Sequence, residues 1–166
     1  MRSAGTEQSG PAMLLIGYGN PLRGDDGVGW HIADAVRAAV HDGGLQVMTV
    51  HQLTPELADA VAAARRVIFV DASCDTAPGS VVARPVACAT GPPPGFGHQY
   101  PPGMLLRLAQ EVYNTAPAAA WLVTVGVADL DCGEGLSPVV QAAAERARTV
   151  ILRLLHATRG PVAASR

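Results

Sequence analysis

The stretch Gly17 to Asp26, GYGNPLRGDD, decides the expected fold, because it joins a short apolar run to a segment with helical periodicity. The run before it is AMLLI. The segment after it, GVGWHIADAVRAAV, places an apolar residue at every fourth position from Val28 to Val40. A strand, a glycine-rich turn and a helix in this order are typical of the opening unit of an α/β fold.

The same alternation continues along the chain and predicts five strands with helices on both faces of the sheet. The strands are expected at Ala12 to Ile16, Leu45 to Val50, Arg66 to Val70, Ser80 to Val86 and Trp121 to Val127. Helices are expected from Val28 to Val40, from Thr54 to Ala64, around Met104 to Val112 and from Ser137 to His156, with Thr54 and Ser137 as caps. The apolar positions of the third helix are Met104, Leu105, Leu108 and Val112, and the buried stripe of the last is expected at Val140, Ala143, Ala147, Val150 and Leu154. No internal repeat or linker divides this pattern, so one domain is expected.

Composition excludes several classes of function. The chain has 166 residues, a formal net charge of −2 and twelve basic residues, all of them arginine. Without excess positive charge, neither a nucleic acid nor an anionic membrane is an expected partner. The absence of lysine also excludes a Schiff-base lysine and the lysine of a phosphate-binding loop.

The glycine-rich loop fits two nucleotide-binding motifs poorly. As a dinucleotide fingerprint it has Leu22 in place of the third glycine, and His51 and Gln52 stand where an acid would end the second strand. As a phosphate loop it places Asp25 and Asp26 where a lysine and a hydroxyl residue belong, and two carboxylates would repel phosphate. A structural alternative is that one of these acids caps the following helix.

A cation site is the remaining interpretation of the loop. An aspartate at a helix N-terminus stays ionised and is a ready oxygen ligand. Asp71 follows the apolar run RRVIFV and would open into the same crevice if the first and third strands are neighbours, and His98 lies in the later loop TGPPPGFGHQYPP. Two carboxylates and an imidazole suit a first-row divalent ion such as nickel, zinc or manganese, although spacing alone does not select this trio.

Four motifs together resemble the hydrogenase maturation proteases, cytoplasmic endopeptidases that trim a C-terminal extension from the large subunit of nickel–iron hydrogenase. They are GYGNPLRGDDGVG, VIFVDA, GHQ and VGVADLDCGEGLSP, and the resemblance runs from Met13 to about Leu155. It implies a single three-layer α/β/α domain with a twisted, mostly parallel five-stranded sheet. One strand would be antiparallel, which is assigned to Ser80 to Val86.

The resemblance also implies a site and a reaction. Asp26, Asp71 and His98 match the family's metal ligands and are expected to be the catalytic and metal-binding residues. The ion would be nickel supplied by the precursor of a hydrogenase large subunit, with zinc or cadmium as a surrogate in vitro. The loop expected to receive the substrate comprises Gly17, Gly19, Asn20, Gly24, Asp25, His51 and Gln52.

These expectations describe a cytoplasmic monomer that hydrolyses a peptide bond. The alternative function is a non-catalytic module of the same architecture that binds nickel or a nucleotide. Residues 1–12 are expected to be a disordered leader, 13–157 the protease-like domain and 158–166 a flexible tail.

Overall fold

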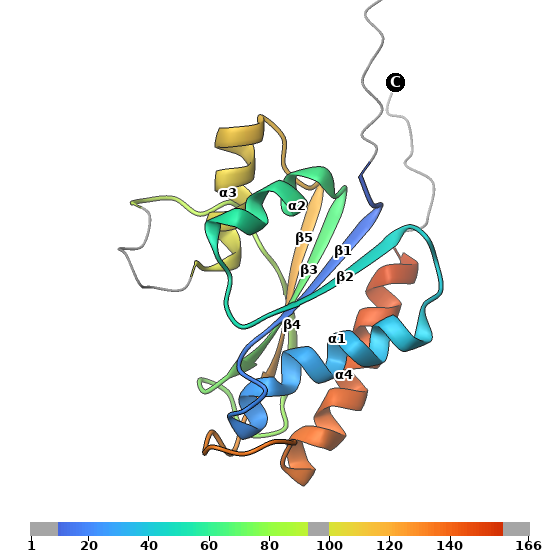
Figure 1. Ribbon diagram of the computed structural model, residues 1–166, viewed down its shortest axis with the longest axis vertical. Coiled ribbons are helices and arrows are strands. Elements are labelled where there is room, and N and C mark those ends of the chain that lie inside the picture. The colour runs from blue at the N-terminus through green and yellow to red at the C-terminus, as the bar shows by residue number, and fades with distance from the viewer. Residues whose placement is uncertain (1–9, 93–99, 158–166) are drawn as a thin grey trace, which may run out of the picture.

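The computed structural model describes residues 10–92 and 100–157, which contain a five-stranded sheet of order β2-β1-β3-β5-β4 (Figure 1). The first four strands in this order are parallel, and β4 runs antiparallel to β5, as predicted for this segment. The strands are β1 (Met13–Tyr18), β2 (Leu45–Val50), β3 (Arg66–Ser73), β4 (Val81–Pro85) and β5 (Ala119–Gly126). The helices are α1 (Val28–Ala39), α2 (Ala58–Ala63), α3 (Pro102–Tyr113) and α4 (Pro138–Ala157), with short 3-10 turns η1 (Gly24–Gly27) and η2 (Pro55–Leu57).

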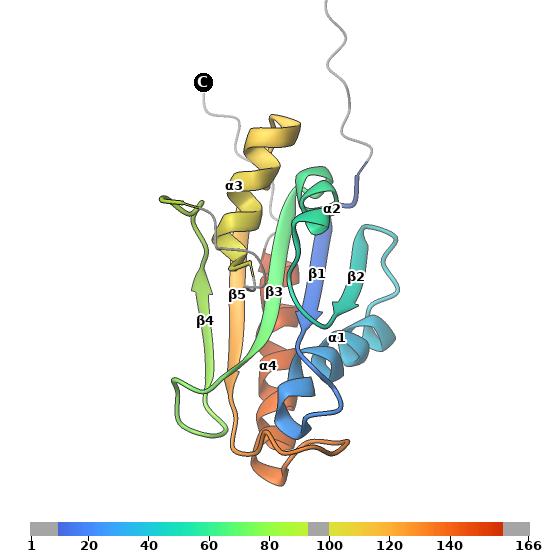
Figure 2. The ribbon, with the colours of Figure 1, turned by 60° about the vertical axis from the view of Figure 1, so that its left-hand side comes forward.

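Helices cover both faces of the sheet, which makes three layers. Figures 1 and 2 show α1 and α4 on one face and α2 and α3 on the other. Successive residues of a strand point to opposite faces of the sheet, and their apolar side chains belong to two separate clusters, one on each face. Leu15 and Ile68 pack under α1 and α4, whereas Ile16 and Phe69 pack under α2 and α3. The three-layer α/β/α architecture expected from the sequence is therefore confirmed.

The strand order places the carboxyl ends of β1 and β3 side by side. β1 pairs with β2 on one side and β3 on the other, with Gly17 opposite Val70. The residues that follow this pair, Tyr18 and Asp71, are therefore neighbours on adjacent strands. A crevice beyond the carboxyl ends of parallel strands is the usual ligand site of such sheets.

Two predicted helices differ in detail from the structure. The segment expected to form one helix from Thr54 to Ala64 is divided into η2 and the short α2, and the Thr54 side chain makes no capping hydrogen bond. In α3, Val112 was expected on the apolar face but is 62% exposed, because the buried positions are Met104, Leu105, Leu106 and Ala109.

The predicted buried stripe of α4 is correct only over its first part. Val140, Ala143 and Ala147 are buried as expected. Further along, Ile151 and Leu155 are buried, whereas the predicted positions Val150 and Leu154 are only half-buried. The predicted positions are spaced on average about 3.5 residues apart, slightly less than one helical turn of about 3.6 residues, so they move gradually off the buried face. By the end of the helix, the buried residues lie one position after the predicted ones.

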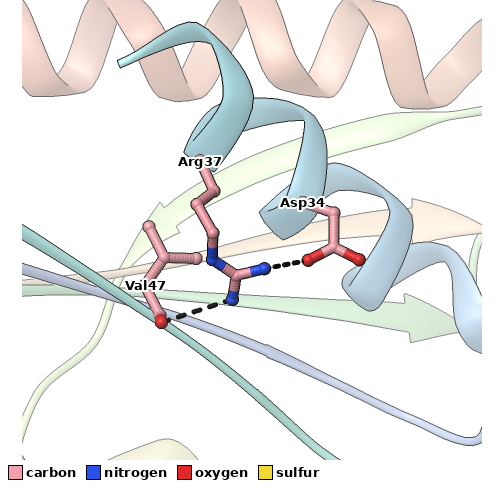
Figure 3. A network of polar contacts seen from close by, with 3 residues as sticks. All are labelled: Asp34, Arg37 and Val47. Atoms are coloured by element: carbon pink, nitrogen blue, oxygen red, sulfur yellow. Dashed lines mark hydrogen bonds and ion pairs between the residues drawn. The ribbon is translucent and has the colours of Figure 1, made fainter. Parts of the chain in front are cut away.

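The two outer strands carry features that oppose further strand pairing. On β2, the Arg37 guanidinium donates a hydrogen bond to the Val47 carbonyl at 3.3 Å and pairs with Asp34 (Figure 3). At the two ends of β4, Ser80 accepts a hydrogen bond from the Gly126 N–H and Val86 donates one to the Ala120 carbonyl. The backbone of Pro85 therefore points away from β5, and its missing N–H removes no hydrogen bond between these strands.

The predicted leader and tail fall largely outside the described residues, which begin at Gly10 and end at Ala157. Within the part of the chain that the structure describes, no helix is both long enough and apolar enough to cross a membrane.

Candidate functional site

The loop after β1 is held against the end of β2 by its backbone. Gly19 has a φ of +130°, a conformation that favours glycine, and its N–H donates to the carbonyls of Val50 and His51 at 3.2 Å. A Cβ atom at this position would lie 2.0 Å from the Asp26 carbonyl oxygen. Glycine is therefore required here, because the chain passes directly over the turn that carries Asp26.

Asp26 lies in η1, directly before α1, and its carboxylate is held by one hydrogen bond. The Asn20 backbone N–H donates to its Oδ2 at 2.8 Å. The Asn20 side chain in turn accepts the Leu22 N–H at 3.0 Å, which fixes the turn between them. Asp26 is half-buried, and its second carboxylate oxygen has no described partner.

Asp71 lies inside β3, two residues before its end, rather than just after the strand as the sequence predicted. Its carboxylate accepts hydrogen bonds from the Tyr18 hydroxyl and the Ala72 N–H. Burial raises the pKa of Asp71, the two hydrogen bonds lower it, and the nearby charge of Asp26 raises it again, with a net pKa of about 6. Asp26 is therefore close enough for its charge to act on Asp71.

Asp25 has a different environment from Asp26. It is fully buried, and its carboxylate accepts four hydrogen bonds between 2.7 and 3.0 Å. Their donors lie in the loop from β5 to α4: the N–H groups of Ala128, Asp129 and Ser137 and the Ser137 hydroxyl. Desolvation opposes ionisation of Asp25, but these hydrogen bonds outweigh it and lower the pKa.

The predicted roles of Asp25 are accordingly revised. Its side chain does not cap the adjoining helix, since it bonds to residues more than one hundred positions away. Nor does it line a surface that a substrate could reach, since none of its area is exposed. Asp25 ties the glycine-rich loop to the loop before α4.

Counting occupied lone pairs separates the three acids. An ionised carboxylate offers about four acceptor positions. Asp25 has four donors, Asp71 two and Asp26 one. Of these three acids, Asp26 and Asp71 are therefore the ones whose oxygen lone pairs are not all used by donors within residues 10–92 and 100–157.

The other predicted residues fall into three groups. Gly17 and Gly24 are backbone positions under close contacts, Gly17 packing against the Gly29 carbonyl and Gly24 having a φ of +51°. His51 and Gln52 are exposed at the end of β2, where His51 lies against the Trp30 ring at 5.2 Å between centroids. His98, the third predicted ligand, lies outside the described residues.

Two residues important to the site escaped the sequence interpretation. Tyr18 belongs to the glycine-rich motif and lies two residues beyond the end of the expected first strand, so its position beside Asp71 was not predicted. Ser137 was interpreted as a helix cap, and nothing in the sequence signalled its contact with Asp25.

Over residues 10–92 and 100–157, no cluster of three or more histidine, cysteine, aspartate or glutamate side chains forms a complete metal site. A hollow of about 500 Å³ lies where α1 and α4 end, lined by residues that include Val40, His41 and Leu155. Neither Asp26 nor Asp71 lines it. The candidate site is thus the open edge bearing two carboxylates, with capacity for one or more further ligands.

Comparison with known proteins gives a clear result for the fold. The maturating endopeptidase HybD of E. coli superimposes with a TM-score of 0.69 and 23% identity, over 89% of this chain and 93% of that one. The nickel–iron hydrogenase maturation protease HycI of Thermococcus kodakarensis gives 0.69 and 21%, over 89% and 95%. The chain has the fold of the hydrogenase maturation endopeptidases.

A third structure of this fold, a hydrogenase 2 maturation peptidase from a Thaumarchaeota archaeon, gives a TM-score of 0.67 and 22% identity, over 87% of this chain and 97% of that one. No protein-family model and no curated protein matches the sequence. The maturation-endopeptidase fold extends over nearly the whole length of each of these proteins, so the likeness is not confined to a common core.

Proposed function

We propose that this protein is an endopeptidase that removes a C-terminal extension from the nickel-loaded precursor of a nickel–iron hydrogenase large subunit. One observation carries the proposal. In a maturation-endopeptidase fold, Asp26 and Asp71 share the edge where β1 and β3 end, and the described residues leave part of the acceptor capacity of both carboxylates unused. The third neighbouring acid, Asp25, is fully satisfied and excluded from this role.

The chemistry of the two carboxylates suits recognition of a cation carried by another protein. Oxygen ligands from Asp26 and Asp71, with the imidazole of His98 as the predicted third ligand, leave coordination positions open for ligands from the precursor. A divalent ion docked there would polarise the scissile carbonyl or lower the pKa of a water. One of the carboxylates would accept a proton during hydrolysis.

Nickel is thus part of the substrate rather than a resident cofactor, and zinc or cadmium would bind to the same ligands as surrogates. This arrangement makes cleavage conditional on metal loading of the precursor. The partner is the hydrogenase large-subunit precursor, and the protein acts as a monomer in the cytoplasm.

The test is a processing assay with a nickel-loaded and a nickel-free precursor, analysed by intact-protein mass spectrometry. Cleavage of the loaded form alone is expected. Asp26→Ala and His98→Ala should abolish cleavage, whereas Asp34→Ala, which removes an exposed acid of α1, should not. A mobility shift without cleavage would favour a nickel carrier, and tight binding of ATP or NAD would favour a nucleotide-binding module.

A further inference from the structure

Tyr18 combines deep burial with a polar contact to the candidate site. It is the last residue of β1, and only 4% of its surface is exposed. Its ring continues the apolar row of Leu14 and Ile16 under α2 and α3. A hydroxyl buried in such a cluster needs a hydrogen-bond partner.

The partner is the Asp71 carboxylate. Pairing of Gly17 with Val70 sets Tyr18 beside Asp71, and Asp71 follows Phe69 on the same face of β3. The Tyr18 hydroxyl donates a hydrogen bond to Asp71. A phenol hydroxyl is protonated at neutral pH, so it acts as a donor toward the ionised carboxylate.

We propose that Tyr18 is a positioning residue, whose hydroxyl holds the Asp71 carboxylate in the orientation that receives a divalent cation. The inference rests on the proposed function for its biological meaning but not for its test. The Tyr18 hydroxyl and the Ala72 N–H both donate to the Asp71 carboxylate, and two donors leave part of its acceptor capacity for a cation. Rotation of the carboxylate would break the tyrosine hydrogen bond.

Tyr18 differs in this respect from the residues that would touch the cation. It lies in the apolar layer under α2 and α3, and its described hydrogen bond to the site is the one to the Asp71 carboxylate. Donors of this kind orient the ligand and tune its basicity, and their loss commonly costs 10–100-fold in metal affinity. The effect of removing the hydroxyl should thus appear in cation binding rather than in folding.

The experiment compares Tyr18→Phe with Tyr113→Phe, a control that removes a hydroxyl from a residue 45% exposed on α3. Zn²⁺ is titrated into each protein by calorimetry at pH 7.5, and thermal unfolding is measured without metal. Tyr18→Phe should weaken Zn²⁺ binding roughly 10–100-fold with little change in unfolding temperature. The control should bind as the unmodified protein does.

Unchanged Zn²⁺ affinity in Tyr18→Phe would overturn the inference, and so would an unmodified protein that binds no Zn²⁺. A lower unfolding temperature with normal affinity would show that the hydroxyl is purely structural. An unmodified protein that binds Zn²⁺ yet leaves the nickel-loaded precursor intact would reject the proposed function, while the comparison of affinities would still decide the role of Tyr18.

Discussion

Asp25 and Asp26 are consecutive residues whose carboxylates have opposite environments. Asp25 is buried and accepts four hydrogen bonds from the loop before α4, whereas Asp26 accepts one, from Asn20, among the residues that the structure describes. The two acids therefore have different roles. The Asp25 carboxylate fixes the glycine-rich loop, and the Asp26 carboxylate lies at the edge of the sheet.

Replacing Asp25 by Asn should destabilise the protein by roughly 2–4 kcal/mol, because an amide cannot accept hydrogen bonds from four donors. The measurement is urea unfolding at pH 7. Asp34→Asn, which alters an exposed ion pair, should cost at most about 1 kcal/mol. Equal losses in the two variants would contradict the role assigned to Asp25.

The Asp25 contribution should also depend on pH. Its pKa is lowered by folding, so its stabilisation is present above the ordinary value of 3.8 and is lost as the pH falls through the folded value. The difference in unfolding free energy between the unmodified protein and Asp25→Asn should therefore be constant from pH 5 to 7 and shrink below about pH 4. A difference that grew on acidification would refute this assignment.

Asp71 should show the reverse dependence. Its folded pKa of about 6 exceeds the ordinary 3.8, so its contribution to stability is complete below 3.8 and is lost as the pH rises through 6. In metal-free protein, Asp71→Asn should raise the unfolding midpoint at pH 7.5, by on the order of 2–4 °C for each kcal/mol relieved, while removing cleavage. At pH 4 the two proteins should unfold at similar temperatures.

The titration of Asp71 can be followed directly by carboxyl ¹³C NMR in metal-free protein. A midpoint near 6 is expected. Asp26→Asn should lower it, because the neighbouring negative charge is removed, whereas Asp34→Asn should leave it unchanged. A midpoint insensitive to Asp26 would mean that the two carboxylates do not share a space in solution.

Gly19→Ala should disturb the site although it adds only a methyl group. The new Cβ would meet the Asp26 carbonyl at 2.0 Å, in a backbone conformation with a φ of +130°. A loss of at least about 2 kcal/mol in unfolding free energy is expected, together with lower Zn²⁺ affinity. Gly43→Ala is the matched control, since nothing lies within 4 Å of its added Cβ. Two variants of equal stability would show that the close approach at Gly19 is relieved by small shifts.

Much of the fold was predictable, because short apolar runs alternate with segments of helical period along the chain. The encounter of Asp26 with Asp71 was predictable too, since it requires only that β1 and β3 be neighbours. The division of the second helix was not, because the sequence from Thr54 to Ala64 has helical composition throughout and the 3-10 turn at its start is a tertiary outcome.

The partners of Asp25 and Tyr18 lay beyond sequence reasoning for a different reason. Ser137 is 112 residues from Asp25, and only the packing of two loops brings them together. The Tyr18 contact depends on register as well as strand order, and a shift of one residue would turn either side chain to the other face. The role of His98 stays a prediction.

The guanidinium of Arg37 and the ring of Pro85 close the two lateral borders of the sheet. Both features oppose pairing with the strand of another chain, so concentrated solutions should remain free of fibrillar material. An Arg37→Ala, Pro85→Val variant, which lacks both features, should instead form aggregates that bind thioflavin. The aggregates should form from protein that is still folded.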